Sequence, residues 1–103
     1  MRIVKVSKTF DAALDELLSF GASRFGRRVA DEKLDDVLAT VRNVLAVRPQ
    51  MGTFEPRLRL YRYEIRRVPF VVLFDYDDRE LRLYTVVHAR SDIPNTDLSE
   101  IAW

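Results

Sequence analysis

A run of five arginines between residues 57 and 67 contains a single acid, Glu64. The planar guanidinium group makes paired hydrogen bonds to a carboxylate or a phosphate, so this run could bind nucleic acid or an acidic protein. It could equally protect the edge of a sheet from aggregation. The arginines are Arg57, Arg59, Arg62, Arg66 and Arg67.

His88 is the only histidine, and Arg90 and Asp92 follow it at spacings of two residues. An imidazole can act as a general acid near neutral pH, but it needs a positioned substrate and a second catalytic group. A histidine at the end of a strand needs only a hydrogen bond. We therefore predict a structural role for His88 and an ion pair between Arg90 and Asp92.

The composition excludes several kinds of site. The chain has no cysteine, so disulfides, thiolate metal sites and a cysteine nucleophile are excluded, and one histidine cannot form a histidine cluster. Asp75, Asp77 and Asp78 could together suggest a site for a hard cation. Two of them fall in or beside a predicted hairpin turn, so we interpret them as solvated turn residues. The sequence predicts no metal and no cofactor.

The chain has the balance of a globular protein, with 103 residues, 48% hydrophobic and 32% charged. We expect one domain spanning residues 1–103. The net charge of +1 hides a polarity, because residues 24–67 carry a net +5 and residues 68–103 a net −4. No apolar run approaches the roughly 20 residues of a membrane span, and no secretory leader is recognisable, so we expect a cytoplasmic protein with no membrane partner.

Two amphipathic helices are predicted in the first half of the chain. The first follows a short strand over residues 1–6, with Ser7 or Thr9 as its N-cap and Gly26 as its stop. The second covers residues 28–47, since Pro49 forbids its continuation. Together they predict a helical hairpin.

The second half of the chain predicts three strands after a loop over residues 48–56. Residues 57–67 alternate with a slip near residues 60–61 that predicts a bulge. Residues 70–76 are nearly all apolar, as in a central strand covered on both faces, and residues 81–88 alternate again. The order β-α-α-β-β-β predicts an α+β fold with the helical hairpin packed on a mostly antiparallel sheet.

The last residues predict a short helical turn that ends at Trp103. A tryptophan there either packs back onto the sheet or anchors a partner. We expect it to pack back, and we keep it as a candidate partner contact.

The sequence LRLYRYEIRRVPFVVLFDYDDRELRLYTVVHARSD, residues 58–92, resembles the RelE/ParE superfamily of bacterial toxins. The similar features are an aromatic-started apolar strand, an acidic hairpin turn, a second strand and a closing His-x-Arg-x-Asp. The predicted element order and the length of the chain also agree with this superfamily. The resemblance implies the toxin of a type II toxin–antitoxin system, neutralised by a cognate antitoxin. RelE-like members cut mRNA on the ribosome, whereas ParE-like members poison DNA gyrase and are not nucleases.

An ungapped alignment to the RelE-like pattern distinguishes the two activities. Positions where the nucleases place cations fall on Val71, Glu64 and Ser91, and their C-terminal tyrosine falls on Asp97. RNA cleavage without a metal requires proton transfer and cations around the scissile phosphate, so the catalytic set is incomplete. Should the chain be a nuclease, the candidate catalytic residues would be Arg62, Arg66, Arg90 and His88.

We therefore predict a ParE-like toxin that inhibits DNA gyrase by protein–protein binding and has no catalytic residues. The alternatives are a RelE-like ribosome-dependent mRNA endonuclease, with ribosome and mRNA as partners, and an inert antitoxin-binding member. We expect the antitoxin to fold onto the helical hairpin and an outer strand. The candidate partner-binding residues are Arg57, Arg59, Arg62, Arg67, Arg90 and Trp103.

Overall fold

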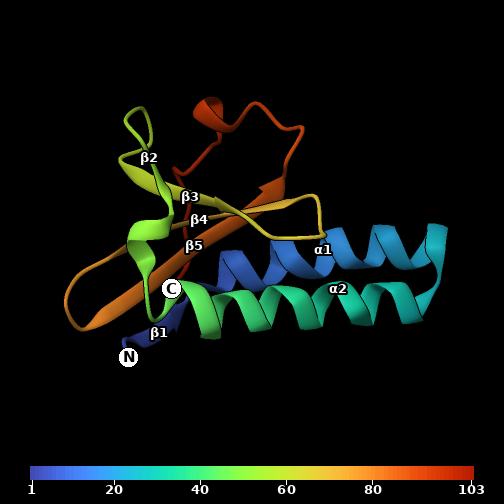
Figure 1. The fold of residues 1–103 in the computed structure, drawn as a ribbon. Helices are drawn as coiled ribbons and strands as arrows, with labels where there is room; N and C mark the ends of the chain where they lie inside the picture. Colours follow the sequence, from blue (N-terminus) through green and yellow to red (C-terminus); the bar gives the residue numbers. More distant parts are fainter.

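The computed structural model describes residues 1–103 as two layers, with a pair of helices across one face of a sheet (Figure 1). The strands lie in the order β1-β5-β4-β3-β2, and every neighbouring pair is antiparallel except β1 and β5. This arrangement confirms the predicted α+β fold. No helix has the length and apolar character needed to cross a membrane. The elements are β1 (Ile3–Val6), α1 (Lys8–Phe25), α2 (Arg27–Thr40), β2 (Thr53–Glu55), β3 (Leu60–Glu64), β4 (Phe70–Tyr76) and β5 (Glu80–His88).

Both predicted boundaries of the first helix are confirmed. The buried Ser7 is the N-cap of α1: its Oγ accepts a hydrogen bond from the Phe10 N–H at 2.8 Å and donates one to the Tyr84 carbonyl at 2.6 Å. At the other end Gly26 has φ +92°, and its N–H donates to the Ala22 carbonyl at 2.9 Å. Gly26 is also the only residue between the two helices, so it forms the whole turn of the hairpin.

The second helix continues beyond α2 through one π-helical turn, Val41–Leu45. The Ala46 N–H closes this turn on the Val41 carbonyl at 2.9 Å. The helical path therefore ends close to the predicted residue 47. Pro49 then opens a short 3₁₀ turn, Pro49–Met51, as its fixed φ and missing N–H require.

β4 is the central strand of the sheet, as predicted, and both of its faces are buried. Val72 and Phe74 belong to the larger hydrophobic cluster between the sheet and the helices. Leu73 belongs to a smaller cluster on the opposite face, which Ile93 and Leu98 of the C-terminal segment help to cover. The continuous apolar run in the sequence therefore correctly indicated a strand with both faces covered.

The bulge predicted near residues 60–61 is wrong, since β3 pairs with both neighbours in continuous register. Leu60 faces the smaller cluster and Tyr61 packs against the larger one, so the break in alternation reflects two apolar strand faces and not an inserted residue. The irregularity lies instead between β4 and β5. Leu73 pairs with Thr85 and Phe74 with Leu83, which leaves Tyr84 as the extra residue.

Three further predictions need correction. Residues 48–56 are not all loop, because Thr53–Glu55 forms β2 against β3. The strand predicted over residues 57–67 is only Leu60–Glu64, since both of its ends turn away from the sheet. The helical turn predicted to end at Trp103 is absent, and the C-terminal segment contains a 3₁₀ turn at Ile93–Asn95 instead.

Candidate partner-binding surfaces

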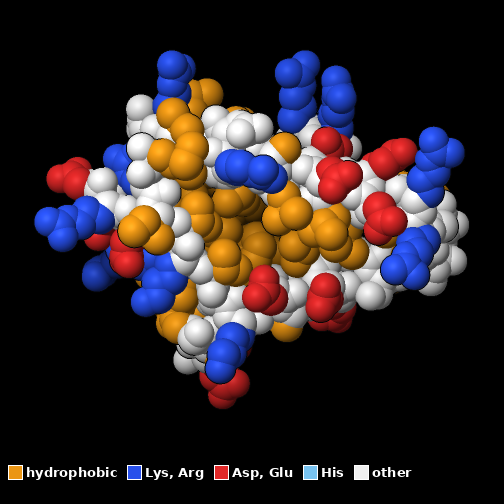
Figure 2. All heavy atoms as spheres, turned by 90° about the horizontal axis from the view of Figure 1, so that it is seen from below, with side chains coloured by type: hydrophobic (Ala, Val, Ile, Leu, Met, Phe, Trp, Pro, Cys, Tyr) orange, Lys and Arg blue, Asp and Glu red, His pale blue; other side chains and the backbone are white.

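A hydrophobic groove lies where β1 meets the two helices. It has a volume of about 340 Å³, and Figure 2 shows hydrophobic side chains gathered in a hollow on this face with charged side chains at its margins. The edge strand, both helices and β5 contribute to its lining. Six of the hydrophobic residues that line it are Val4, Val6, Phe10, Leu14, Val37 and Leu38.

The groove borders an open edge of the sheet. β1 has β5 on one side and no strand on the other, so its outer edge can pair with an added chain. Apolar side chains that line the groove are exposed beside this edge: Val6 of β1 is 39% exposed and Leu38 of α2 is 46% exposed. Two charges, Asp11 on α1 and Arg42 on the π-helical turn, complete the lining. This surface can therefore offer backbone hydrogen bonds and apolar contacts together.

The arginine run does not form one surface. Arg57 and Arg59 lie in the turn before β3, whereas Arg66 and Arg67 lie in the turn after it. Arg59 and Arg67 have φ of +55° and +71°, the left-handed conformation common in turns. At about 3.3 Å per strand residue, the two turns are separated by roughly 20 Å. The role of these residues in partner binding stays a prediction.

Arg62 lies between these turns, on β3, and lines a hollow on the sheet face away from the helices. Its Nη1 is 4.0 Å from Glu55 Oε2. The hollow has a volume of about 320 Å³, and Arg62 is the only cation among its lining residues. Glu64 and Val71 line it as well. Two of the four positions that the alignment found unsuited to RNA cleavage therefore lie beside Arg62.

The four nuclease candidates are not gathered at this hollow. Arg66 lines a different one beside α2, on the helical face of the sheet. His88 ends β5, and its Nδ1 accepts a hydrogen bond from the Arg90 N–H at 3.1 Å, the contact expected of a structural histidine. The predicted ion pair between Arg90 and Asp92 is wrong. A turn at residues 88–91 ends the strand alternation, and Asp92 Oδ2 instead accepts a hydrogen bond from Asn95 Nδ2 at 2.6 Å.

Trp103 packs back onto the sheet, as expected, and keeps 43% of its surface exposed. Its ring lies edge-on to Tyr84 with centroids 5.0 Å apart, and Lys5 Nζ lies 5.7 Å from its centroid. The preceding Ala102 is joined to the start of α1: its carbonyl accepts a hydrogen bond from the Lys8 N–H at 2.7 Å, and its N–H donates to Thr9 Oγ1 at 2.8 Å. The C-terminal segment is thus fastened to the N-terminus of α1.

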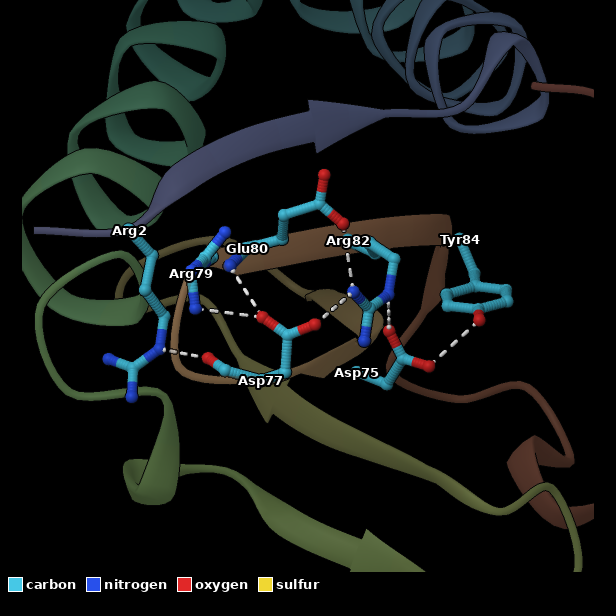
Figure 3. A network of polar contacts seen from close by, with 7 residues as sticks. All are labelled: Arg2, Asp75, Asp77, Arg79, Glu80, Arg82 and Tyr84. Carbon is cyan, nitrogen blue, oxygen red and sulfur yellow. Dashed lines mark hydrogen bonds and ion pairs between the residues drawn. The ribbon is translucent and has the colours of Figure 1, made fainter.

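A polar network at the β4–β5 hairpin was not predicted from the sequence. Arg82 pairs with Asp75 at 2.6 Å, with Asp77 at 3.0 Å and with Glu80 at 3.0 Å, and Tyr84 Oη donates to Asp75 Oδ2 at 2.8 Å (Figure 3). A signal was present, because a turn at residues 77–79 places Asp75 directly opposite Arg82 in the antiparallel register. Two of the three aspartates considered for a cation are therefore already paired with an arginine.

Hydrogen bonds and burial in this network shift the pKa values of Asp77 and Tyr84. The Asp77 carboxylate accepts from the backbone N–H groups of Glu80 and Arg79 and from Arg82, which lowers the pKa of Asp77 to about 2. Burial, with the hydrogen bond to Asp75, raises the pKa of Tyr84. These groups hold the turn together, and none of them lines the groove beside β1.

The family model for the ParE toxin of type II toxin–antitoxin systems, parDE, matches residues 4–93. The chain belongs to the ParE toxin family. The match runs from β1 to the buried Ile93 and so includes the groove, both helices and the hairpin with the Arg82 network. The predicted superfamily is confirmed, and so is its ParE-like branch. Membership also implies an antitoxin as partner.

The fold of this ParE-family toxin is similar to a solved chain of a chromosomal ParDE TA system from P. aeruginosa. The TM-score is 0.72 at 19% sequence identity, and the similarity covers 85% of this chain and 96% of that chain. At this identity the likeness concerns the fold. No curated protein matches the chain.

Proposed function

We propose that this toxin inhibits DNA gyrase by protein–protein binding and that its cognate antitoxin neutralises it by folding into the groove beside β1. The observation that carries the second part is the groove itself, where an unpaired strand edge and an apolar lining lie side by side. An extended segment of the antitoxin would add a strand to β1, and an amphipathic segment would place apolar side chains between the helices.

The energetics of the groove suit a partner that folds as it binds. Each large aliphatic side chain taken from water contributes roughly 1.5–3 kcal/mol. Ordering a disordered segment costs roughly 2–5 kcal/mol, so three or four anchors are enough for a net gain. Val6 and Leu38 are exposed on the toxin and can receive such anchors. Asp11 and Arg42 would orient the partner through their opposite charges.

A binding mechanism, and not RNA cleavage, is supported by the hollow around Arg62. Cleavage without a metal needs several donors directed at one phosphate. Here Arg62 is accompanied by a carboxylate, Glu64, and by the apolar Val71, and Arg66 lies on the other face of the sheet. Glu64 would repel a phosphate at this position.

Two assays test the proposal. Hydrogen exchange of the purified toxin, with and without the antitoxin encoded beside it, should show protection in β1 and in the groove-facing turns of α1 and α2. Protection confined to the turn at residues 77–80 would contradict the groove assignment.

A supercoiling assay with purified DNA gyrase should show inhibition with trapped cleavage complexes. Codon-phased cuts in translated mRNA, with gyrase unaffected, would establish the RelE-like activity instead.

A further inference from the structure

The tip of the helical hairpin extends beyond the sheet (Figure 1). Two aromatic rings are exposed at this tip. Phe20 is 64% exposed and Phe25 is 61% exposed, although both belong to α1. Packing does not require them, because the buried residues near the tip are Gly21 and Ala30. A protein that exposes two large rings on a protruding tip has a surface suited to a partner.

Cations surround these rings. The Arg24 guanidinium carbon lies 5.8 Å from the centroid of Phe20 and 5.7 Å from that of Phe25. Lys33 Nζ, reaching across from α2, lies 5.5 Å from the Phe25 centroid. Arg27 then follows directly in the first turn of α2, which contains no acid. The two rings and their cations thus form one aromatic and cationic cluster at the tip.

We propose that this tip, formed by Phe20, Arg24, Phe25, Arg27 and Arg28, docks into a concave acidic surface of the toxin's target protein. The inference rests on the proposed function, since it assigns the target contact of a toxin that acts by protein binding. Phenylalanine and arginine are both enriched in protein interfaces, and arginine is among the residues that dominate their binding energy. A convex, cationic tip complements a hollow lined by carboxylates.

The charges further along the helices disfavour nucleic acid and lipid as the occupant. Asp31 and Glu32 follow the tip on α2, and Glu32 already pairs with Arg28 at 3.7 Å. Exposed carboxylates also precede the tip on α1, at Asp15 and Glu16. A phosphate backbone or an anionic bilayer lying along the hairpin would be repelled by these acids. A protein pocket that receives only the tip would meet fewer of these acids, and its carboxylates would replace Glu32 as the partner of Arg28.

The tip is separate from the groove. Leu14 is the last α1 residue that lines the groove, and Phe20 lies six residues further along. At about 1.5 Å per residue this separation is about 9 Å, and it is about 16 Å to Phe25. An antitoxin that occupies only the groove would leave the tip side chains uncovered. Binding of the two partners can then be altered independently.

The test compares tip variants with a matched control. The tip variants are Phe20→Ala/Phe25→Ala and Arg24→Glu, and the control is Phe54→Ala, whose ring is 52% exposed on β2, away from the hairpin. Growth arrest on induction and inhibition of purified gyrase are measured, with circular dichroism as the check on folding. We expect each tip variant to lose about 30-fold or more in inhibition, the range of interface hot spots. Phe54→Ala should remain within about twofold, and antitoxin affinity should be unchanged in all three.

The other possible results would contradict either the docking role of the tip or the choice of gyrase as target. Tip variants that fold and inhibit like the wild type would overturn the inference and leave the proposed function intact. Binding of the wild type to short DNA or to vesicles of anionic phospholipid, lost in the tip variants, would assign the tip to another partner and overturn it as well. If the wild type arrests growth without affecting gyrase, gyrase is not the target. The tip inference is then tested by comparing growth arrest between the tip variants and the wild type. A wild type that does neither overturns both.

Discussion

Glu64 pairs with Val71 across β3 and β4, and both side chains line the hollow that contains Arg62. The pair places a carboxylate and an aliphatic side chain where a nuclease of this superfamily would place cations. A single substitution cannot restore such a site, because catalysis needs several donors that act together on one transition state.

We therefore predict that the purified toxin does not cleave mRNA on the ribosome. Losing one transition-state donor costs about 10²–10³ in rate, and here several are absent. The measurement is translation of a defined message with added toxin, followed by mapping of the mRNA ends. Cuts phased with the codons would contradict the prediction. Loss of those cuts in Arg62→Ala, with Arg57→Ala as a control in the neighbouring turn, would then identify Arg62 as a catalytic cation.

The Asp77 carboxylate predicts an acid-sensitive hairpin. Its pKa is about 2 in the folded protein against an ordinary value of 3.8. A lowered pKa means that the ionised form stabilises the fold above the unfolded pKa, and that this contribution is lost as the pH falls from about 4 to about 2. Thermal unfolding of the wild type should therefore shift to lower temperature over that range. Asp77→Asn should be less stable at pH 6 and should lose less on acidification.

The neighbouring Asp78 provides the control for this measurement. Asp78 is exposed and makes no ion pair or side-chain hydrogen bond, so Asp78→Asn should follow the wild-type pH dependence. Equal pH curves for Asp77→Asn and the wild type would show that the three hydrogen bonds to Asp77 do not act on stability. Both variants remove one negative charge, so a difference between them reports the contacts and not the net charge.

The glycines of the helical hairpin predict opposite effects of the same substitution. Gly26 has φ +92° and ψ 160°, a region that side chains avoid, and a Cβ added there would meet nothing within 4 Å. Gly26→Ala should therefore cost about 1–3 kcal/mol through the backbone alone. Gly21 lies inside α1, and a Cβ there would meet only Lys33 Nζ at 3.7 Å, an ordinary contact.

Gly21→Ala should accordingly be neutral or stabilise by up to about 1 kcal/mol, the difference in helix propensity. Urea unfolding followed by circular dichroism measures both variants. Destabilisation by Gly21→Ala would show that the helices cannot absorb the added methyl group. An unchanged midpoint for Gly26→Ala would show that the hairpin turn has another conformation of similar energy.

Local signals in the sequence were sufficient where one residue type suits one conformation. An N-cap at Ser7 or Thr9 and a helix stop at Gly26 were predicted from side-chain chemistry and backbone freedom alone, and Ser7 is the N-cap. The apolar run of β4 also predicted its central place. β2 could not be predicted, because its three residues become a strand only by pairing with β3.

The candidate site was less predictable than the fold, because it depends on which elements become neighbours. The arginine run is continuous in sequence, but left-handed turns at Arg59 and Arg67 direct its two ends away from β3. The groove requires β1 to pair in parallel with β5, which lies more than seventy residues later. Helical periodicity predicted apolar stripes on both helices without indicating which part of them stays uncovered. Leu38 of α2 is an example, an apolar position that lines the groove and is exposed.

The exposed Leu38 allows the groove to be tested without unfolding the toxin. It lines the groove from α2 and is 46% exposed, so Leu38→Asp should change the free energy of unfolding by less than about 1 kcal/mol. A carboxylate buried against an apolar antitoxin side chain is costly, and antitoxin affinity should fall by about 100-fold or more. Titration calorimetry with the purified antitoxin measures this loss. Phe54→Asp, at a ring 52% exposed on β2, should bind like the wild type. Equal losses in the two variants would place the antitoxin elsewhere, whereas a loss confined to Leu38→Asp, with gyrase inhibition retained, would separate neutralisation from toxicity.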